Sequence, residues 1–243
     1  PRSSLAPGTN RHCNRRVEPS ELAAVVRGVH RDPHRVLGVH PDGDETVFRH
    51  LAPGAERVWL VEGERELEPV GDGLFELRTA EPAPTRPYQL GRQLAGRDMV
   101  VYDPYCFPPT VGELDTHLIA EGRHYELHRV LGARPLRHAG VEGVAFTVWA
   151  PAARAVRVVG DFNRWQGRGH AMRLLNEAVW ELFVPGLGPG AVYKLEIVTV
   201  GGKRFMKTDP VAQAMELRPR NASVVTQSKH RWGDDAWMEK RAQ

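Results

Sequence analysis

The sequence lacks most of the features that point directly to a compartment or a redox role. Its 243 residues contain only two cysteines, Cys13 and Cys106, which have no CxxC partner. A disulfide framework or a cysteine-based zinc site is therefore not expected, and a reducing, cytoplasmic location is predicted. No apolar run approaches the roughly 18 residues of a spanning helix. The first residues also lack the apolar core of a signal peptide, so no membrane partner is expected.

Catalytic and cofactor-binding motifs are missing as well. The chain has no G-x-S-x-G, no phosphate-binding or Rossmann glycine pattern and no H-E-x-x-H. Its eleven histidines show no converging spacing, which favours surface or helix-end positions. Adjacent acids such as Asp234 and Asp235 do not place two carboxylates across a cleft. We therefore expect no catalytic residue, no metal and no cofactor in this chain.

The charge balance argues against a polyanionic partner. Lys and Arg total 33 against 30 Asp and Glu, and the arginines are scattered singly. A nucleic-acid footprint normally gathers its charge on one face or stripe, so nucleic acid is not expected. A hydrophobic content of 41% and a charged content of 26% are ordinary for a globular protein. The length predicts two domains, each of about a hundred residues.

The strongest local pattern lies in residues 144–168, VAFTVWAPAARAVRVVGDFNRWQGR. Apolar residues alternate with smaller or polar ones over 144–149, which is typical of a half-buried strand ended by Ala-Pro. A second strand is predicted over 156–160, and turn-forming residues follow at 160–163. Trp165 comes next, in a polar loop where periodicity gives no reason to bury it. A large aromatic side chain in that setting needs a partner.

The same order of signals occurs twice in the chain, which indicates an internal repeat. The matched positions are Leu37 with Leu131, Ala52-Pro53 with Ala150-Pro151, Val58 with Val156, Phe75 with Trp180, Tyr88 with Tyr193, and Asp103 with Asp209. The separation grows steadily from 94 residues at the first pair to 106 at the last. Two homologous domains with small loop insertions produce such a trend. The second copy carries the longer, aromatic-bearing loop, so it is the better candidate for binding a ligand.

We predict a mainly β fold of two tandem immunoglobulin-like β-sandwich modules joined by short helices. The expected division is a disordered tail over 1–17, a first module with a leading helix over 18–108, a helical linker over 109–132, a second module over 133–226 and a connector over 227–243. Ser20 is expected to cap the first helix. Thr110 and Glu113 match a capping box that opens a second helix ending at Gly122. Strands in the first module are expected over 46–51, 57–61, 74–77, 88–94 and 99–102.

The other large aromatic residues separate by pattern. Trp149 and Trp180 lie in alternating strand segments, and core packing is predicted for both. Trp59 is expected at the contact between the two modules. Trp232 and Trp237, in the charged C-terminal segment, are predicted to pack against something beyond this chain. Lys194 lies on the polar side of its strand, where a solvated lysine is the ordinary interpretation.

Both halves resemble known modules of glucan enzymes. FTVWAPAARAVRVVGDFNRWQGRGHAMR, VWELFVPG, YKLEI and KTDPVAQ resemble the family-48 carbohydrate-binding module that precedes the catalytic barrel of glycogen branching enzymes. HRDPHRVLGVHPDG through VYDPYCFPP resembles the diverged module at the N-terminus of many bacterial 1,4-α-glucan branching enzymes, and KHRWGDDAWMEKR is similar to their connector into the barrel. The resemblance covers residues about 29 to 226. It implies a glucan chain transferase of glycogen synthesis, with an Asp nucleophile and a Glu acid/base on the barrel.

The resemblance also implies binding residues in the second module. In that module family the Trp after the GDFN-type turn stacks on glucose, and a Lys after the Tyr of the later strand hydrogen-bonds the sugar. Trp165 and Lys194 match these positions. A second aromatic residue is usual three positions before the Asp-Pro, where this chain has Met206. The expected Asn near the last strand falls at about Ala222.

A catalytic barrel needs about 250 residues of its own, and the two sandwiches use the whole chain. Because the sequence also starts at Pro1, we expect a fragment that is inactive alone, with α-glucan and a barrel domain of the same parent protein as its partners. One alternative is a free-standing glycogen-targeting subunit that recruits a partner enzyme through Trp232 and Trp237. A basic nucleic-acid binder is disfavoured, because the aromatic residues are not interleaved with clustered Lys and Arg.

Overall fold

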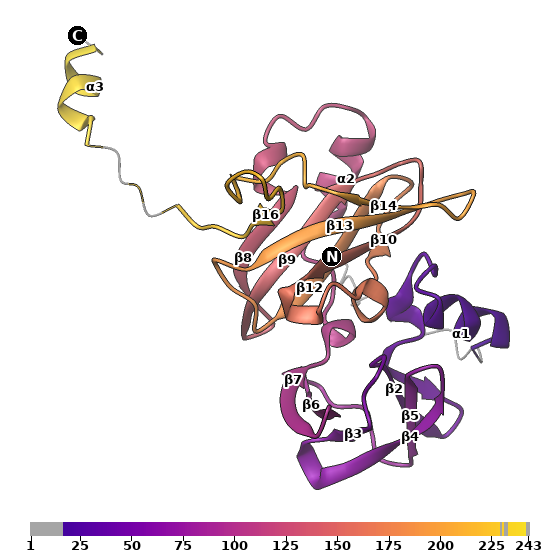
Figure 1. Cartoon of the computed structure of the whole chain (residues 1–243). Coiled ribbons are helices and arrows are strands. Elements are labelled where there is room, and N and C mark those ends of the chain that lie inside the picture. Colours follow the sequence, from indigo (N-terminus) through magenta and orange to yellow (C-terminus); the bar gives the residue numbers. More distant parts are fainter. Residues whose placement is uncertain (1–16, 229, 231–232, 242–243) are drawn as a thin grey trace, which may run out of the picture.

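The computed structural model describes residues 17–228, 230 and 233–241, and these form a mainly β protein (Figure 1). The first part contains α1 (Pro19–Val26), β1 (Gly38–Asp42), β2 (Glu45–Leu51), β3 (Arg57–Leu60), β4 (Arg65–Gly71), β5 (Leu74–Thr79), β6 (Gln89–Leu94) and β7 (Arg97–Tyr102). After α2 (Glu113–Ala120) follow β8 (Gly132–His138), β9 (Val141–Trp149), β10 (Ala153–Gly160), β11 (Arg173–Leu174), β12 (Val179–Pro185), β13 (Val192–Thr199), β14 (Arg204–Lys207), β15 (Ala214–Met215), β16 (Ser223–Val224) and α3 (Asp235–Arg241). We call β1–β7 the first module and β8–β16 the second module.

The first module is one continuous strand path, β1-β2-β5-β4-β3-β6-β7, folded over its own core. Strand β4 changes its partner along its length: residues 65–67 pair with β3, and residues 68–71 pair with β5, with a register shift between Pro69 and Gly71. This change of partner allows the strand path to fold over its own core. The core inside this path includes Phe48, Val58, Phe75 and Leu90. The predicted sequence strands are present, but β1 and β4 were not among them. Strand β4 buries only Leu67 fully, so its apolar signal is weak.

The second module is a sandwich of two sheets. One sheet has the order β11-β12-β9-β8, and the other has β10-β13-β16-β15 with β14 added beside β13. Inward side chains from both sheets share one core, in which Phe146, Val158 and Trp180 are almost fully buried. The predicted mainly β fold of two sandwich modules is confirmed.

The internal repeat is visible in one hydrogen-bonded pair of each module. The hydroxyl of Tyr88 donates to Asp103 Oδ2 at 2.6 Å, and the hydroxyl of Tyr193 donates to Asp209 Oδ2 at 2.6 Å. The other oxygen of each aspartate accepts a hydrogen bond from the backbone amide two residues later, at 3.0 Å in both cases. The matched residues of the repeat therefore make the same buried contact twice.

Two helix starts differ from the sequence prediction. Helix α1 begins at Pro19, so Ser20 lies inside it, and the backbone N–H of Glu18 instead donates to the Glu21 carboxylate at 3.2 Å. Helix α2 begins after Gly112, without a side-chain cap from Thr110. The amide and hydroxyl of Thr110 donate instead to the carboxylate of Glu181 in the second module. Thr110 therefore bonds to the buried carboxylate of Glu181 on another element and does not cap α2.

The burial of the tryptophans differs in part from the sequence prediction. Trp180 is 1% exposed, which confirms its core position, but Trp149 is 55% exposed and its predicted burial is wrong. Because residues 144, 146 and 148 of β9 face the core, Trp149 falls on the opposite face of the strand. Trp59 packs over Gly91 of the neighbouring strand β6, where a Cβ atom would overlap the indole ring. Trp59 thus contacts its own module.

The two modules share one apolar cluster. Leu37, Leu51 and Tyr105 of the N-terminal part belong to the same buried cluster as the core of the second module. The Tyr105 hydroxyl donates to the Ala171 carbonyl at 3.3 Å and accepts from the Ala171 amide at 3.0 Å. The modules are therefore packed as one unit.

Arg157 fixes the end of α1 to the second module. It is 4% exposed, and its guanidinium donates to Glu196 at 2.8 Å, to the Gly28 carbonyl at 2.8 Å and to the Arg27 carbonyl at 2.7 Å. Gly28 has φ +63°, and a Cβ atom there would lie 2.8 Å from Arg157 Nε. A glycine is required at this position both by its backbone conformation and by the close approach of the arginine.

Glu181 fixes the linker between the modules. It is completely buried on β12, and one carboxylate oxygen accepts from Arg173 Nε at 2.8 Å. The other oxygen accepts from the amide and hydroxyl of Thr110, at 3.0 and 2.8 Å. Arg173 also donates to the Phe107 carbonyl at 3.2 Å. These bonds hold the segment that enters α2 against the second module.

The buried histidines make stability fall in mild acid. Burial, reinforced by Arg92 and His50, lowers the pKa of His170 to about 3, and burial lowers the pKa of His34 well below 6.5. A lowered folded pKa means that unfolding takes up protons once the pH is below the unfolded value. The stabilisation from both histidines is therefore fully present above pH 6.5 and is lost as the pH falls below that value, down to about pH 3 for His170.

We expect a lower urea midpoint at pH 5 than at pH 7. His170→Gln should reduce this difference, whereas His128→Gln should leave it unchanged, because His128 is exposed. Equal midpoints at the two pH values in the unmodified chain would contradict the prediction.

Some sequence predictions fall on residues 1–16, 229, 231–232 and 242–243, outside the described part of the chain; they include the N-terminal tail with Cys13 and the role of Trp232. Cys106 is a free thiol. Among the described residues, the helices are all too short or too polar to cross a bilayer. The same residues contain no group of three or more His, Cys, Asp or Glu side chains arranged to hold a metal ion.

Candidate functional site

Trp165 lies at the end of a tight turn that leaves β10. The turn contains the short 3-10 helix η5 (Asp161–Asn163). The Asn163 side chain accepts from the Gly160 amide at 3.0 Å and donates to the Val158 carbonyl at 2.9 Å. The amide of Trp165 donates to the Gly160 carbonyl at 2.8 Å. Gly160 has no room for a Cβ atom, which would overlap the carbonyl oxygen of Val192, the first residue of β13.

The turn holds two consecutive residues in the left-handed region, Arg164 at φ 53° and Trp165 at φ 61°. For a residue other than glycine this conformation costs about 1–2 kcal/mol. Such strain persists where surrounding bonds over-determine it, and it is frequent at binding sites. The indole N–H of Trp165 donates to Asp161 Oδ1 at 2.9 Å, and the side chain is 37% exposed. The strained turn therefore holds an oriented indole that is partly open to solvent.

Phe162 and Trp165 make different contacts. Phe162 packs on Phe146, with ring centroids 6.4 Å apart, and on His170 at 5.4 Å. These inward ring contacts place Phe162 beside the core of the second module. The hydrogen bond to Asp161 ties the Trp165 ring to the turn rather than to Phe162.

Lys194 lies on the outer face of β13, since Tyr193 and Leu195 on either side of it face the core. Its ammonium group donates to Asn221 Oδ1 at 2.6 Å. The Asn221 carbonyl accepts from the Thr208 hydroxyl at 2.7 Å, which anchors the segment. Because an ammonium group has three N–H donors, Lys194 keeps donors for a ligand.

Asn221 is the functional candidate that the sequence missed by one position. The sequence offset put the expected asparagine at Ala222, but Ala222 is 2% exposed and packs inward. The neighbouring Asn221 makes the contact with Lys194. The sequence does show an asparagine next to the expected position. The segment before β16 is irregular, however, and has no alternating pattern from which to decide which residue faces Lys194.

The sheet brings the turn and Asn221 to the same end of β13. Gly160, Tyr193 and Ser223 are paired in one row across β10, β13 and β16. The turn that follows Gly160 and the segment that precedes Ser223 therefore flank the first residues of β13, where Lys194 lies. The structure places the predicted residues Trp165 and Lys194 in one region of the second module.

Met206 lies on the same face of this sheet. It pairs with Glu196, which is two residues from Lys194 and so shares its face. Met206 is 47% exposed, and the neighbouring Phe205 projects to the other face of the strand. The position where a second aromatic residue is usual thus offers a flexible apolar side chain.

Comparisons with known proteins follow the division into two modules. Residues 18–105 match the family described as alpha-1,4-glucan branching enzyme GlgB, N-terminal domain, and residues 130–212 match carbohydrate-binding module 48 (isoamylase N-terminal domain). Trp165 and Lys194 lie inside the second match, and Asn221 lies beyond it.

Curated relatives extend well beyond this chain. The 1,4-alpha-glucan branching enzyme GlgB 2 of Streptomyces coelicolor is 46% identical over 230 residues, which cover 93% of this chain and 31% of that protein. The corresponding enzyme of Burkholderia thailandensis is 46% identical over 236 residues, covering 93% of this chain and 28% of its own length. A pullulanase structure from Anoxybacillus sp. LM18-11 aligns with a TM-score of 0.36 at 14% identity, over 78% of this chain and 27% of that one, which is too distant to support an argument. The chain therefore spans less than a third of the curated relatives it matches.

Proposed function

We infer that this chain, which belongs to the 1,4-alpha-glucan branching enzymes as part of their N-terminal region, binds α-glucan on the face formed by Trp165, Lys194 and Asn221. The chemistry of the parent protein, transfer of α-1,4-linked segments to form α-1,6 branches in glycogen, is assigned to a catalytic barrel of that protein. The two modules position the glucan chain for it. The cytoplasmic location predicted from the cysteines is part of the same proposal.

The observation that supports the proposal is the strained turn that holds the Trp165 indole at the same end of β13 as the Lys194–Asn221 pair. An indole face matches the C–H face of a pyranose ring, and covering it contributes about 1–2 kcal/mol by area. Lys194 and Asn221 offer N–H donors to sugar hydroxyls at the same end of the sheet. With one aromatic platform and Met206 in place of a second, we expect millimolar affinity for maltooligosaccharides, or about −4 kcal/mol.

Trp165→Ala is expected to abolish retention of the chain on an amylose or glycogen affinity gel. The melting temperature should stay nearly unchanged, because the indole is a surface platform. Lys194→Met should weaken retention without changing stability. Trp149→Ala is the matched control, since it removes a tryptophan that is 55% exposed elsewhere on the second module.

Two results would refute the proposal. In the first, the unmodified chain passes through the gel without retardation. In the second, Trp165→Ala lowers the free energy of unfolding by about 3–5 kcal/mol, as the loss of a core aromatic does. The second module would then be a scaffold that holds the other domains of the parent protein.

Trp237 bears on the alternative of a free-standing glycogen-targeting subunit. It is 58% exposed on α3, where the Arg241 guanidinium lies 5.4 Å from the ring centroid. Such an aromatic residue suits contact with further protein, which in the branching-enzyme proposal is the barrel of the parent protein. Capture of a separate enzyme by the purified chain would favour the alternative.

A further inference from the structure

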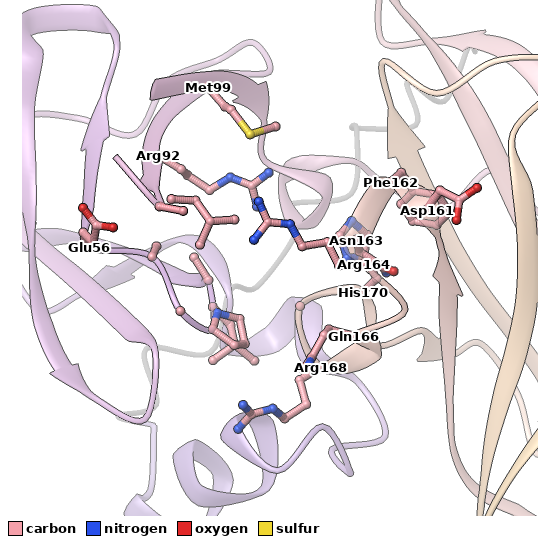
Figure 2. A pocket seen from close by; sticks show the side chains of 18 residues that line it. Glu56, Arg92, Met99, Asp161, Phe162, Asn163, Arg164, Gln166, Arg168 and His170 are labelled. Carbon is pink, nitrogen blue, oxygen red and sulfur yellow. The ribbon is translucent and has the colours of Figure 1, made fainter. Parts of the chain in front are cut away.

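A cavity of about 820 Å³ lies between the two modules (Figure 2). Residues 51–56 and parts of β6 and β7 form one wall, and residues 161–170 of the second module form the other. Arg164 and Gln166 line the cavity, whereas Trp165 between them does not. The cavity is thus separate from the face proposed to bind glucan.

Three arginines line this cavity: Arg92 on β6, Arg164 in the turn after β10, and Arg168 in η6 (Gly167–His170). Figure 2 shows the guanidinium groups of Arg92 and Arg164 extending toward one another from opposite modules. Arg92 is half-buried, and its pKa is lowered by that burial. Within the described part of the chain, no carboxylate forms a hydrogen bond or an ion pair with any of the three.

Two acidic side chains, Glu56 and Asp161, also line the cavity. Glu56 accepts a hydrogen bond from the Gly96 amide at 3.2 Å, and Asp161 accepts from the Trp165 indole at 2.9 Å. His170 is also in the lining, but its lowered pKa of about 3 keeps it neutral near pH 7. Three arginines against two carboxylates leave the lining with a net charge of +1, and neutral N–H donors rather than the arginines hold the carboxylates.

Converging guanidinium groups are suited to a compact anion. Their planar N–H pairs match the oxygens of a phosphate or carboxylate bidentately, and a phosphate dianion offsets the repulsion between two of them. The cavity also has apolar lining, including Pro53, Leu94 and Met99. Such a surface fits the C–H face of a sugar ring. The buried Nδ1 atom of His170, which has no hydrogen-bond partner in the structure, adds a polar group at this lining.

We propose that the cavity between the modules binds a phosphate monoester of a small sugar. Arg92 and Arg164 hold the phosphate from the two modules, and Pro53, Leu94 and Met99 face the sugar ring. The site differs from the α-glucan face in ligand charge and in location, and it does not depend on glucan binding at Trp165.

Calorimetric titration of the whole chain at low salt and pH 7.5 tests the proposal with three probes. Inorganic phosphate and glucose 6-phosphate should both bind saturably, the sugar phosphate more tightly, and glucose should not bind measurably. Arg92→Gln and Arg164→Gln should each weaken phosphate binding about tenfold or more, since each removes charge-assisted hydrogen bonds. Arg154→Gln is the matched control, because Arg154 is exposed at the opposite end of β10.

Each other outcome counts against a stated part of the proposal. Absence of saturable phosphate binding refutes the site. An equal loss in Arg154→Gln also refutes it, because the effect would then be one of net charge. Equal affinities for inorganic phosphate and glucose 6-phosphate refute the assignment of a sugar ring to the apolar wall. Arg164 is exposed, so its variant remains informative if Arg92→Gln folds poorly. Trp165→Ala should leave phosphate binding intact, which separates this site from the proposed glucan face.

Discussion

Glu181→Ala is expected to lower the free energy of unfolding by about 3–5 kcal/mol. The substitution leaves the Arg173 guanidinium, which is 8% exposed, without its carboxylate. It also removes the acceptor for both donors of Thr110, so the linker loses its attachment to β12. A buried charge and two donors lose their partners at once, which is far costlier than removing an exposed carboxylate. Equilibrium urea unfolding followed by circular dichroism measures the loss.

Two variants test the cause of this effect. Glu181→Gln keeps an acceptor oxygen of similar shape but loses the charge, so its cost should lie between that of alanine and the unmodified chain. Glu177→Ala removes an exposed carboxylate from the loop between β11 and β12 and should change stability by no more than about 0.5 kcal/mol. A cost for Glu181→Ala as small as that of Glu177→Ala would show that the buried network does not hold the linker.

Arg157→Ala is expected to cost about 3–5 kcal/mol as well, and to loosen α1. Glu196 would remain buried with only the more distant Arg204, at 3.8 Å, as its cation, and the carbonyls of Arg27 and Gly28 would lose their donor. Urea unfolding measures the free energy, and hydrogen exchange at residues 22–29 measures the loosening, because α1 is attached at its C-terminal end. Arg154→Ala, from the exposed position on the same strand, should change neither quantity.

A double substitution separates charge from attachment. Arg157→Met combined with Glu196→Leu replaces the buried ion pair by apolar side chains of similar size, which is often neutral or stabilising. It should recover most of the lost free energy while hydrogen exchange in α1 stays fast, since methionine cannot donate to the two carbonyls. Recovery of slow exchange in the double variant would contradict the proposed attachment.

The alternating strand pattern predicted the fold class. The same alternation, applied strictly, also predicts that Trp149 is exposed. Val144, Phe146 and Val148 face the core, and the alternation then places Trp149 on the other side, where it is 55% exposed. Hydrophobicity alone favoured burial of both tryptophans. Alternation was the better guide, because Trp180 has the same parity as the inward Leu182.

The contacts between elements are the part of the structure that the sequence could not supply. Arg157 and Glu181 are charged residues in strands, where local pattern indicates solvent exposure, yet both are buried by partners distant in the chain. The candidate site shows the same limit. Trp165 and Lys194 were identified by their similarity to a module family, but Asn221 meets Lys194 across 27 residues of mostly irregular chain. No local period fixes such a register.

The two left-handed residues of the turn give it a further property. Arg164 lines the cavity between the modules, and the next residue, Trp165, lies outside that lining. The two proposals therefore place two different ligands at one turn, with Arg164 reaching the cavity and Trp165 the α-glucan face. Thermodynamic linkage requires any effect of one ligand on the affinity for the other to be reciprocal. Affinities that the other ligand leaves unchanged would show that the turn presents its two consecutive side chains independently.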